Sequence, residues 1–161
     1  MLNIENLHQG FLDSPIGILK LRASEKGLTS VSVVEERGME IGGNHVEFHK
    51  KQLKAYFYRR TALSAEHLDL SAHSEFDRSV WKALTEIPFG TTRSYKELSI
   101  AIKNPKAVRA VGTANGRNPI LIIVPCHRII GSDGSLTGFS AGIEKKRFLL
   151  KHEYVLQQEL F

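Results

Sequence analysis

The only cysteine of this 161-residue chain, Cys126, is followed directly by His127 and Arg128. A thiolate is a strong nucleophile, and a neighbouring imidazole or guanidinium favours the ionised form of a thiol. The three residues therefore indicate a reactive cysteine with a reason to ionise, while the ionisation state of the thiol in the free protein stays open. The alternative is an inert thiol, because a cysteine that follows an apolar run commonly behaves as a small buried hydrophobe.

The apolar run 120–124, with the sequence Ile-Leu-Ile-Ile-Val, leads into Pro125 and must position the cysteine. A residue that precedes proline favours extended backbone, and proline cannot donate a hydrogen bond within a central strand. The pattern predicts a buried strand over residues 120–124 that ends at Pro125 and presents the Cys126 thiol at its exit. A turn at residues 131–134 follows.

Positive charge is concentrated in the segment that contains this motif. Residues 93–128 hold seven lysines and arginines against one acid, Glu97, a net charge of +6, whereas the remainder of the chain sums to −1. A merely solvated surface would interleave acids with the bases. The segment instead predicts a surface that binds a polyanion.

The composition limits the class of protein. Hydrophobic residues make up 42% and charged residues 24% of the chain, as in soluble globular proteins. One cysteine excludes an internal disulfide and a zinc site built from several thiolates, and it favours a reducing, cytoplasmic location. Residues 1–6 lack the pattern of a signal peptide, and no apolar run is long enough to span a bilayer.

The first part of the chain predicts a small sheet covered by one helix. Residues 10–36 contain short apolar segments, some of them alternating with polar residues and separated by turns, which predicts an antiparallel hairpin or meander with one covered face. Asn44 is expected to cap a helix over residues 45–59. His45 and His49 lie one helical turn apart, but no third ligand is near, so we expect solvated histidines and no metal.

Residues 61–72 predict a connector with a short strand at residues 68–70, and the character of the sequence changes there to helical. We therefore expect an α/β (α+β) fold. It would have an N-terminal α/β domain at residues 1–72, with a small antiparallel sheet, and a mainly helical C-terminal domain at residues 73–161.

Helix start signals recur in the second part. Ser74 and Ser94 are predicted N-caps, the second of a helix over residues 95–102. A further helix over residues 106–116 follows after a tight turn, and the pair fits a helix-turn-helix. Small residues on this further helix would let its backbone approach a narrow minor groove. The last helix, over residues 143–153, is expected to bury Ile143, Phe148 and Leu149.

Several short motifs of the second part resemble those of one family. They are Pro88-Phe89-Gly90, Ser94-Tyr95, Arg109-Ala110-Val111-Gly112, Asn118-Pro119, Pro125-Cys126-His127-Arg128 and Leu149-Leu150-Lys151-His152-Glu153. In order and spacing they resemble the O6-alkylguanine-DNA alkyltransferases, also called methylated-DNA–protein-cysteine methyltransferases. The likeness covers residues 74–153 closely.

The resemblance implies chemical roles for five residues. Cys126 would accept the alkyl group, His127 would act as its base through a water molecule, and Glu153 would orient that histidine. Tyr95 would help to neutralise the departing guanine, and Asn118 would form a hinge before the active-site segment. Without the resemblance they would be interpreted as ordinary core, turn or surface residues. Adjacent side chains on an extended chain point to opposite sides, which is why a bridging water is expected.

The resemblance also implies that Arg109 enters the duplex and fills the space of a flipped nucleotide, because a buried thiol cannot reach O6 of a stacked base. Without the resemblance Arg109 would be one phosphate contact among several. The expected DNA-binding residues are Tyr95, Lys106, Arg109, Ala110, Gly112, Thr113, Ala114, Arg117 and Arg128. The expected substrate pocket comprises Ile129, Phe139, Ser140 and Ala141.

Three departures from the family pattern carry expectations of their own. Phe139 stands where relatives often have tyrosine, so we expect stacking in place of a hydroxyl contact. Ala141 stands where glycine is common, which would tighten the pocket toward bulky groups. Some relatives hold a structural zinc on N-terminal cysteines, which this chain lacks, so no metal is expected.

The implied function is direct reversal of O6-alkylguanine, and less so of O4-alkylthymine, in double-stranded DNA. Transfer to Cys126 would be irreversible, with one turnover per molecule and no cofactor. We expect a monomer that does not associate with membranes, and leave cooperative binding along DNA open. Two alternatives are a non-catalytic binder of alkylated DNA, disfavoured by the presence of Cys126, and a transcription regulator with a sensor cysteine, disfavoured by the scarcity of long side chains for reading bases.

Overall fold

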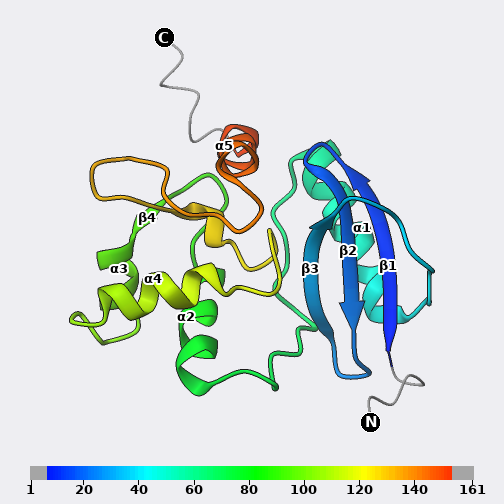
Figure 1. Ribbon diagram of the computed structural model, residues 1–161, viewed down its shortest axis with the longest axis horizontal. Coiled ribbons are helices and arrows are strands. Elements are labelled where there is room, and N and C mark those ends of the chain that lie inside the picture. The colour runs from blue at the N-terminus through cyan, green and yellow to red at the C-terminus, as the bar shows by residue number, and fades with distance from the viewer. Residues whose placement is uncertain (1–6, 154–161) are drawn as a thin grey trace. The chain divides into compact units, whose positions relative to one another are not determined.

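The computed structural model describes residues 7–153, and its first element is an antiparallel sheet of three strands in the order β1-β2-β3 (Figure 1). The strands are β1 (His8–Ser14), β2 (Gly17–Ala23) and β3 (Leu28–Val34). On β2, Leu19, Leu21 and Ala23 alternate along one face and are completely buried. Each buried leucine contributes about 1.5–3 kcal/mol relative to an exposed one. The predicted meander is confirmed.

Helix α1 (Asn44–Arg59) packs against the strands of this sheet (Figure 1). Its N-cap is Gly43 rather than the predicted Asn44, which is the first helical residue, and no side chain caps the helix. His49 is completely buried, with its Nε2 3.3 Å from the carbonyl oxygen of His67, so the expectation of a solvated histidine there is wrong. Burial lowers the pKa of His49.

The apolar run 120–124 does not form the predicted strand. Ile120 makes a single parallel bridge with Val31, and turns follow. Ile122 has a φ of 72°, a left-handed value that an isoleucine in a strand would not adopt. All five residues are buried. The apolar pattern correctly predicted that the run is buried. It did not predict the backbone conformation, because a short apolar run does not by itself specify a strand. The predicted strand at residues 68–70 is likewise only one bridge, between Leu68 and Leu28.

Local capping explains the first two helices after residue 73, α2 (Glu75–Thr85) and α3 (Tyr95–Ala101). The Ser74 hydroxyl accepts a hydrogen bond from the Asp77 N–H, as predicted. Ser94 forms a complete capping box with Glu97. Such caps stabilise a helix by about 1 kcal/mol each. The predicted N-caps of both helices are therefore confirmed.

Helix α4 (Val108–Gly116) follows α3 and packs against both α2 and α3. The indole N–H of Trp81, on α2, donates to the carbonyl oxygen of Ala114 at 2.9 Å inside the core. A parallel pair of two-residue strands, β4 (Arg93–Ser94) and β5 (Ile129–Ile130), then places the start of α3 beside the segment that follows Cys126.

Helix α5 (Ile143–His152) closes the described chain. It buries Leu149 and Leu150, whereas Phe148, which we expected to be buried, is 36% exposed and stacks on His152. Residues 7–72 and 119–123 form one compact unit, and residues 73–118 and 124–153 form the other. No helix within residues 7–153 is long and apolar enough to cross a membrane.

Candidate active site around Cys126

Cys126 lies on a single turn of 3-10 helix, η2 (Cys126–Arg128), and not at the exit of a strand. Its N–H donates to the carbonyl oxygen of Val124 at 2.8 Å, and the Arg128 N–H donates to that of Pro125 at 3.0 Å. Pro125 precedes the turn, where its missing N–H leaves no hydrogen bond unmade. Cys126 is 4% exposed, so its thiol lies inside the protein and not on its surface.

His127 is completely buried and forms a hydrogen bond with Glu153, with 2.8 Å between Nε2 and Oε1. A carboxylate can only accept, so Nε2 carries the proton and Nδ1 is the basic nitrogen. Among the described residues Nδ1 has no hydrogen-bond partner. Burial lowers the pKa of His127, and the bond to Glu153 offsets part of that effect. His127 is therefore a neutral base at neutral pH.

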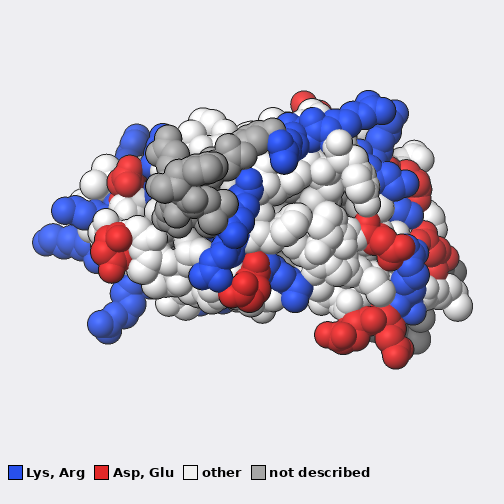
Figure 2. All heavy atoms as spheres, turned by 90° about the horizontal axis from the view of Figure 1, so that it is seen from above, with Lys and Arg blue, Asp and Glu red and all other residues white. Residues whose placement is uncertain are grey.

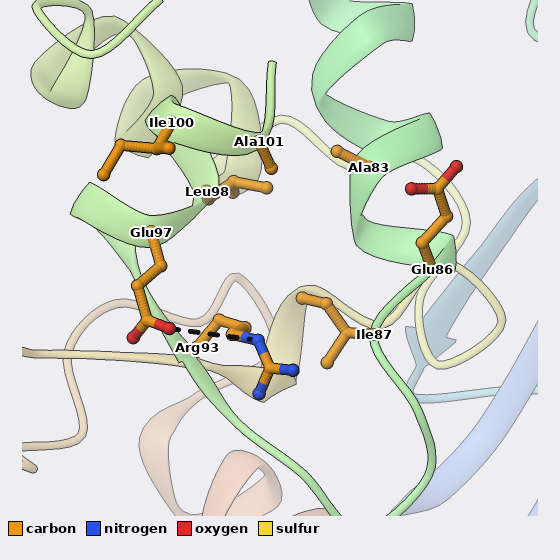
Figure 3. Close-up of a pocket in the computed structure, with 8 residues that line it drawn as sticks. All are labelled: Ala83, Glu86, Ile87, Arg93, Glu97, Leu98, Ile100 and Ala101. Carbon is orange, nitrogen blue, oxygen red and sulfur yellow. Dashed lines mark ion pairs between the residues drawn. The ribbon is translucent and has the colours of Figure 1, made fainter. Parts of the chain in front are cut away.

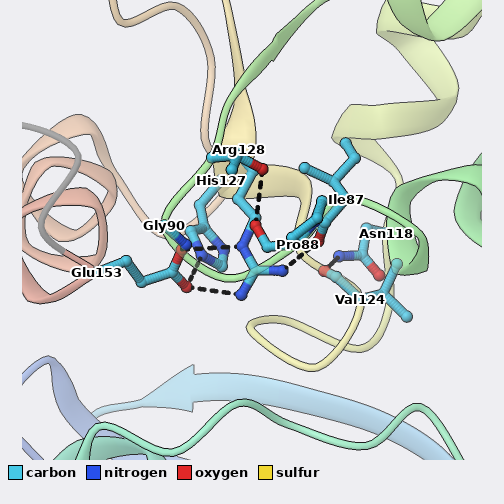
Figure 4. Close-up of polar contacts among 9 residues, drawn as sticks. Ile87, Pro88, Gly90, Asn118, Val124, His127, Arg128 and Glu153 are labelled. Carbon is cyan, nitrogen blue, oxygen red and sulfur yellow. Dashed lines mark hydrogen bonds and ion pairs between the residues drawn. The ribbon is translucent and has the colours of Figure 1, made fainter.

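The Glu153 carboxylate is held by three groups (Figure 4). Arg128 donates to both of its oxygens at 2.8 Å, His127 donates to Oε1, and the Gly90 N–H donates to Oε2 at 3.3 Å. Burial alone would raise the pKa of Glu153, but hydrogen bonds from His127 and Arg128 outweigh it and hold that pKa far below its ordinary value. Glu153 therefore stays ionised.

Arg128, which we expected to bind DNA, is an internal residue instead. It is 6% exposed and also donates from Nη1 to the carbonyl oxygen of Ile87 at 2.6 Å (Figure 4). A guanidinium occupied by a buried carboxylate and a carbonyl is unavailable to phosphates. The motif identified the residue, but not the direction in which its side chain points.

The Cys126 thiol is protonated in the free protein at neutral pH. Burial raises the pKa of Cys126, whereas a hydrogen bond from Asn118 and the charge of Lys146 lower it less strongly. The sequence left the ionisation state of the free thiol open, and burial favours the protonated form. Burial is the dominant cause of the raised pKa, and the Arg128 guanidinium is paired with the Glu153 carboxylate instead of with the thiol.

Asn118 holds the turn that carries Cys126. It is buried, and its Nδ2 donates to the carbonyl oxygen of Val124 at 2.7 Å (Figure 4). The same side chain hydrogen-bonds the thiol and so lowers the pKa of Cys126. Asn118, the predicted hinge, is thus in direct contact with the Cys126 thiol.

Lys146 was not identified from the sequence. It is completely buried on α5, and its Nζ donates to the carbonyl oxygens of Ile129, Thr137 and Gly138 at 2.6, 2.7 and 3.4 Å. Burial lowers the pKa of Lys146 to about 8. Its spacing of three and four residues from the buried Leu149 and Leu150 was the available signal, because it places all three on one helix face.

Tyr95 begins α3, and its hydroxyl lies 3.1 Å from Oγ1 and 3.3 Å from the carbonyl oxygen of Thr137. Its ring lies against α4 at Gly112, where an added Cβ would be 3.5 Å from the ring. Contacts from both Tyr95 and Lys146 therefore converge on Thr137. Of the expected pocket residues, Ile129 is fully buried, Phe139 and Ala141 are half-buried and Ser140 is exposed.

The expected DNA-binding residues of the α3–α4 region divide by exposure. Those that are exposed are Lys106, Arg109, Ala110, Thr113 and Arg117. Ala114, also expected to contact DNA, is instead completely buried, and its backbone carbonyl oxygen accepts the hydrogen bond of the Trp81 indole N–H. Figure 2 shows Lys and Arg side chains projecting at the left, where Figure 1 shows α3 and α4.

A separate hollow of about 360 Å³ lies between α2 and α3 (Figure 3). It is lined by Ala83, Glu86, Ile87, Arg93, Glu97, Leu98, Ile100 and Ala101. It contains none of the expected site residues and no nucleophile, so we do not assign the chemistry to it. Within residues 7–153, no group of three or more His, Cys, Asp or Glu side chains could hold a metal ion.

Comparison with known proteins places this geometry among DNA-repair proteins. Residues 75–155 match the family described as 6-O-methylguanine DNA methyltransferase, DNA binding domain. The methylated-DNA–protein-cysteine methyltransferase of Methanosarcina barkeri is 46% identical over 155 residues, which cover 91% of this chain and 97% of the relative. The counterpart in Mycobacterium tuberculosis is 44% identical over 154 residues, covering 91% and 92%.

Solved structures agree with the sequence comparison. The crystal structure of the Mycobacterium tuberculosis O6-methylguanine methyltransferase superposes with a TM-score of 0.81 at 43% identity, covering 91% of this chain and 92% of that one. A structure of the mycobacterial protein in complex with DNA gives a TM-score of 0.82 at 44% identity, with the same coverage.

Proposed function

Because the chain belongs to the family of methylated-DNA–protein-cysteine methyltransferases, we propose that Cys126 is the cysteine to which it transfers the alkyl group of O6-alkylguanine. The protein binds DNA and repairs it by transfer of the alkyl group to a cysteine. The observation that carries the assignment is the buried Cys126 thiol directly before a neutral histidine whose Nδ1 is free to accept a proton.

Activation of the thiol requires a base, because Cys126 is protonated in the free protein. His127 takes the proton at Nδ1 through a bridging water, and the resulting imidazolium is stabilised by Glu153 at 2.8 Å. Arg128 keeps Glu153 ionised, so the carboxylate stabilises the imidazolium and does not take the proton itself.

Transfer then exchanges one bond for another. The thiolate attacks the alkyl carbon, the S–C bond forms, and the bond from that carbon to O6 breaks with its electron pair moving to the guanine. Tyr95 neutralises the departing guanine with its phenol proton. The product on Cys126 is a thioether, whose S–C bond thiol exchange does not cleave, and the chain has no second thiol to accept another alkyl group. Each molecule therefore reacts once and needs no cofactor.

Recognition of the lesion uses double-stranded DNA. The exposed Arg109 on α4 fills the space of the flipped nucleotide, and the small exposed residues Ala110 and Thr113 allow the helix to approach the minor groove. O4-alkylthymine is a poorer substrate than O6-alkylguanine. The protein acts as a monomer, and a reducing, cytoplasmic compartment suits a reaction that consumes a free thiol.

The direct test is the mass of the protein after reaction. Incubation with excess O6-methylguanine duplex is expected to add one methyl group per molecule, located on the peptide that contains Cys126. Intact-protein and peptide mass spectrometry measure both quantities, and the same duplex with unmodified guanine is the control. More than one turnover per molecule, or a methyl group on another residue, contradicts the proposal.

Replacement of Arg109 by alanine is expected to slow repair of the duplex roughly 10- to 100-fold, because the cost of keeping a base unstacked is no longer offset. Reaction with a free O6-alkylguanine base should keep the wild-type rate, since no base has to be extruded. The matched control is Lys82→Ala, which removes an exposed cation from α2. Equal losses on the duplex and on the free base would assign Arg109 a different role.

A further inference from the structure

Arg117, at the end of α4, forms a two-point ion pair with Asp77 on α2. Its Nη2 lies 2.6 Å from Oδ1 of Asp77 and its Nε lies 3.3 Å from Oδ2. The Asp77 side chain is 12% exposed and that of Arg117 is 53% exposed. A guanidinium that contacts a carboxylate at two points fixes both the distance between the two side chains and their relative orientation. A lysine, with a single contact, would not fix the orientation.

The pair joins the two helices at a defined place. Asp77 is itself fixed, because its N–H donates to the Ser74 hydroxyl that caps α2. One turn further along α2, Trp81 donates to the carbonyl oxygen of Ala114. The end of α4 is therefore attached to α2 at two points, one polar and near the surface and one inside the core.

The residue after Arg117 is Asn118, which touches the reactive group. Asn118 anchors the carbonyl oxygen of Val124 at 2.7 Å and hydrogen-bonds the Cys126 thiol. Backbone bonds run from the Arg117 N–H to the carbonyl oxygens of Thr113 and Ala114. The position of Asn118 is thus set by the last turn of α4, and that turn is held by the ion pair.

We propose that Arg117 and Asp77 are positioning residues for alkyl transfer, which fix the end of α4 so that Asn118 holds the turn carrying Cys126. Arg117 then serves the thiol and not a DNA phosphate, although it lies in the basic segment. The inference rests on the proposed function, namely that Cys126 is the acceptor.

Single-turnover kinetics with an O6-methylguanine duplex separate the two roles of Arg117. In Arg117→Gln and in Asp77→Asn, the maximal rate of methyl transfer is expected to fall by about tenfold, because small misplacements of reacting groups are costly. The dissociation constant for the duplex and its dependence on salt should stay at the wild-type values. Arg117→Lys should give an intermediate rate, since it keeps one contact.

A phosphate contact predicts the opposite pattern. Arg117→Gln would then weaken duplex binding and reduce the slope of log affinity against log salt by about 0.9. Asp77→Asn would tighten binding, because it frees the Arg117 charge. Either result overturns the inference. The matched control is Lys82→Gln, which removes another exposed cation of α2 and should behave as the wild type.

The reactivity of the thiol distinguishes positioning from a general loss of stability. The Asn118 hydrogen bond lowers the pKa of Cys126, so loosening it should shift the pH profile of alkylation by iodoacetamide to higher pH. A variant that is only less stable reacts through its unfolded fraction, whose ordinary, lower thiol pKa shifts the profile to lower pH. That shift, or wild-type rates in both variants, overturns the inference. Wild-type protein that transfers no methyl group would instead refute the proposed function, and the inference with it.

Discussion

Cys126→Ala is expected to abolish alkyl transfer and to leave the affinity for duplex DNA unchanged. Cys126 is the only thiol in the chain, so no other side chain can form the thioether. It is also 4% exposed, and therefore contributes almost no surface to a complex with DNA. The measurement is methyl transfer from a labelled O6-methylguanine duplex, with binding to the same duplex recorded by fluorescence anisotropy.

The matched variant is Cys126→Ser, which keeps the shape of the side chain and replaces the sulfur by a smaller nucleophilic atom. A hydroxyl is far harder to ionise than a thiol, and His127 as a neutral buried base does not compensate for the difference. Transfer should therefore be undetectable in this variant as well. Stoichiometric transfer to the protein in Cys126→Ala would place the acceptor elsewhere, and loss of DNA binding in both variants would show that the thiol supports the binding surface.

Elements with local signals could be predicted from the sequence. A serine hydroxyl three residues before a helix N–H makes the same hydrogen bond in any context, so Ser74 and Ser94 marked the starts of α2 and α3. The alternation of apolar and polar residues on β2 follows directly from having one face of the strand buried and the other exposed. These features are determined within a few residues, which is why they were found.

Features that depend on distant contacts could not be predicted. The run 120–124 is apolar because it is buried, and nothing in its pattern specified the left-handed Ile122. The cations Arg128 and Lys146 resembled surface residues, yet one bonds a carboxylate 25 positions away and the other bonds three carbonyl oxygens. Cys126 is protonated because it is buried, and the types of the neighbouring residues do not predict that burial.

The same reasoning predicts that Glu153→Leu is the most destabilising single change at the site. It leaves the Arg128 guanidinium buried without a counter-charge, which costs about 3–5 kcal/mol in the free energy of unfolding. Alkyl transfer should fall roughly 10²- to 10⁴-fold, because His127 loses the carboxylate that orients it and stabilises its charged form. Urea unfolding and single-turnover transfer measure the two effects.

A double variant separates the effect on stability from the effect on alkyl transfer. In Arg128→Met with Glu153→Leu both charges are absent, and replacing a buried ion pair by apolar residues is often neutral for stability. Most of the lost unfolding free energy should return, while transfer stays low because His127 still lacks its partner. Recovery of transfer together with stability would mean that Glu153 acts only through the fold.

The stability difference between wild type and Glu153→Leu should also depend on pH, with a definite sign. The pKa of Glu153 is below its ordinary value of 4.5 in the folded protein, so ionised Glu153 stabilises the fold fully above pH 4.5. That contribution is lost as the pH falls below 4.5, because the unfolded chain then binds a proton that the folded protein does not. Urea unfolding at pH 7 and at pH 3 to 4 should therefore show a smaller gap between the two proteins in acid. A gap that stays constant over this range would mean that Glu153 is not held as an ionised carboxylate between His127 and Arg128.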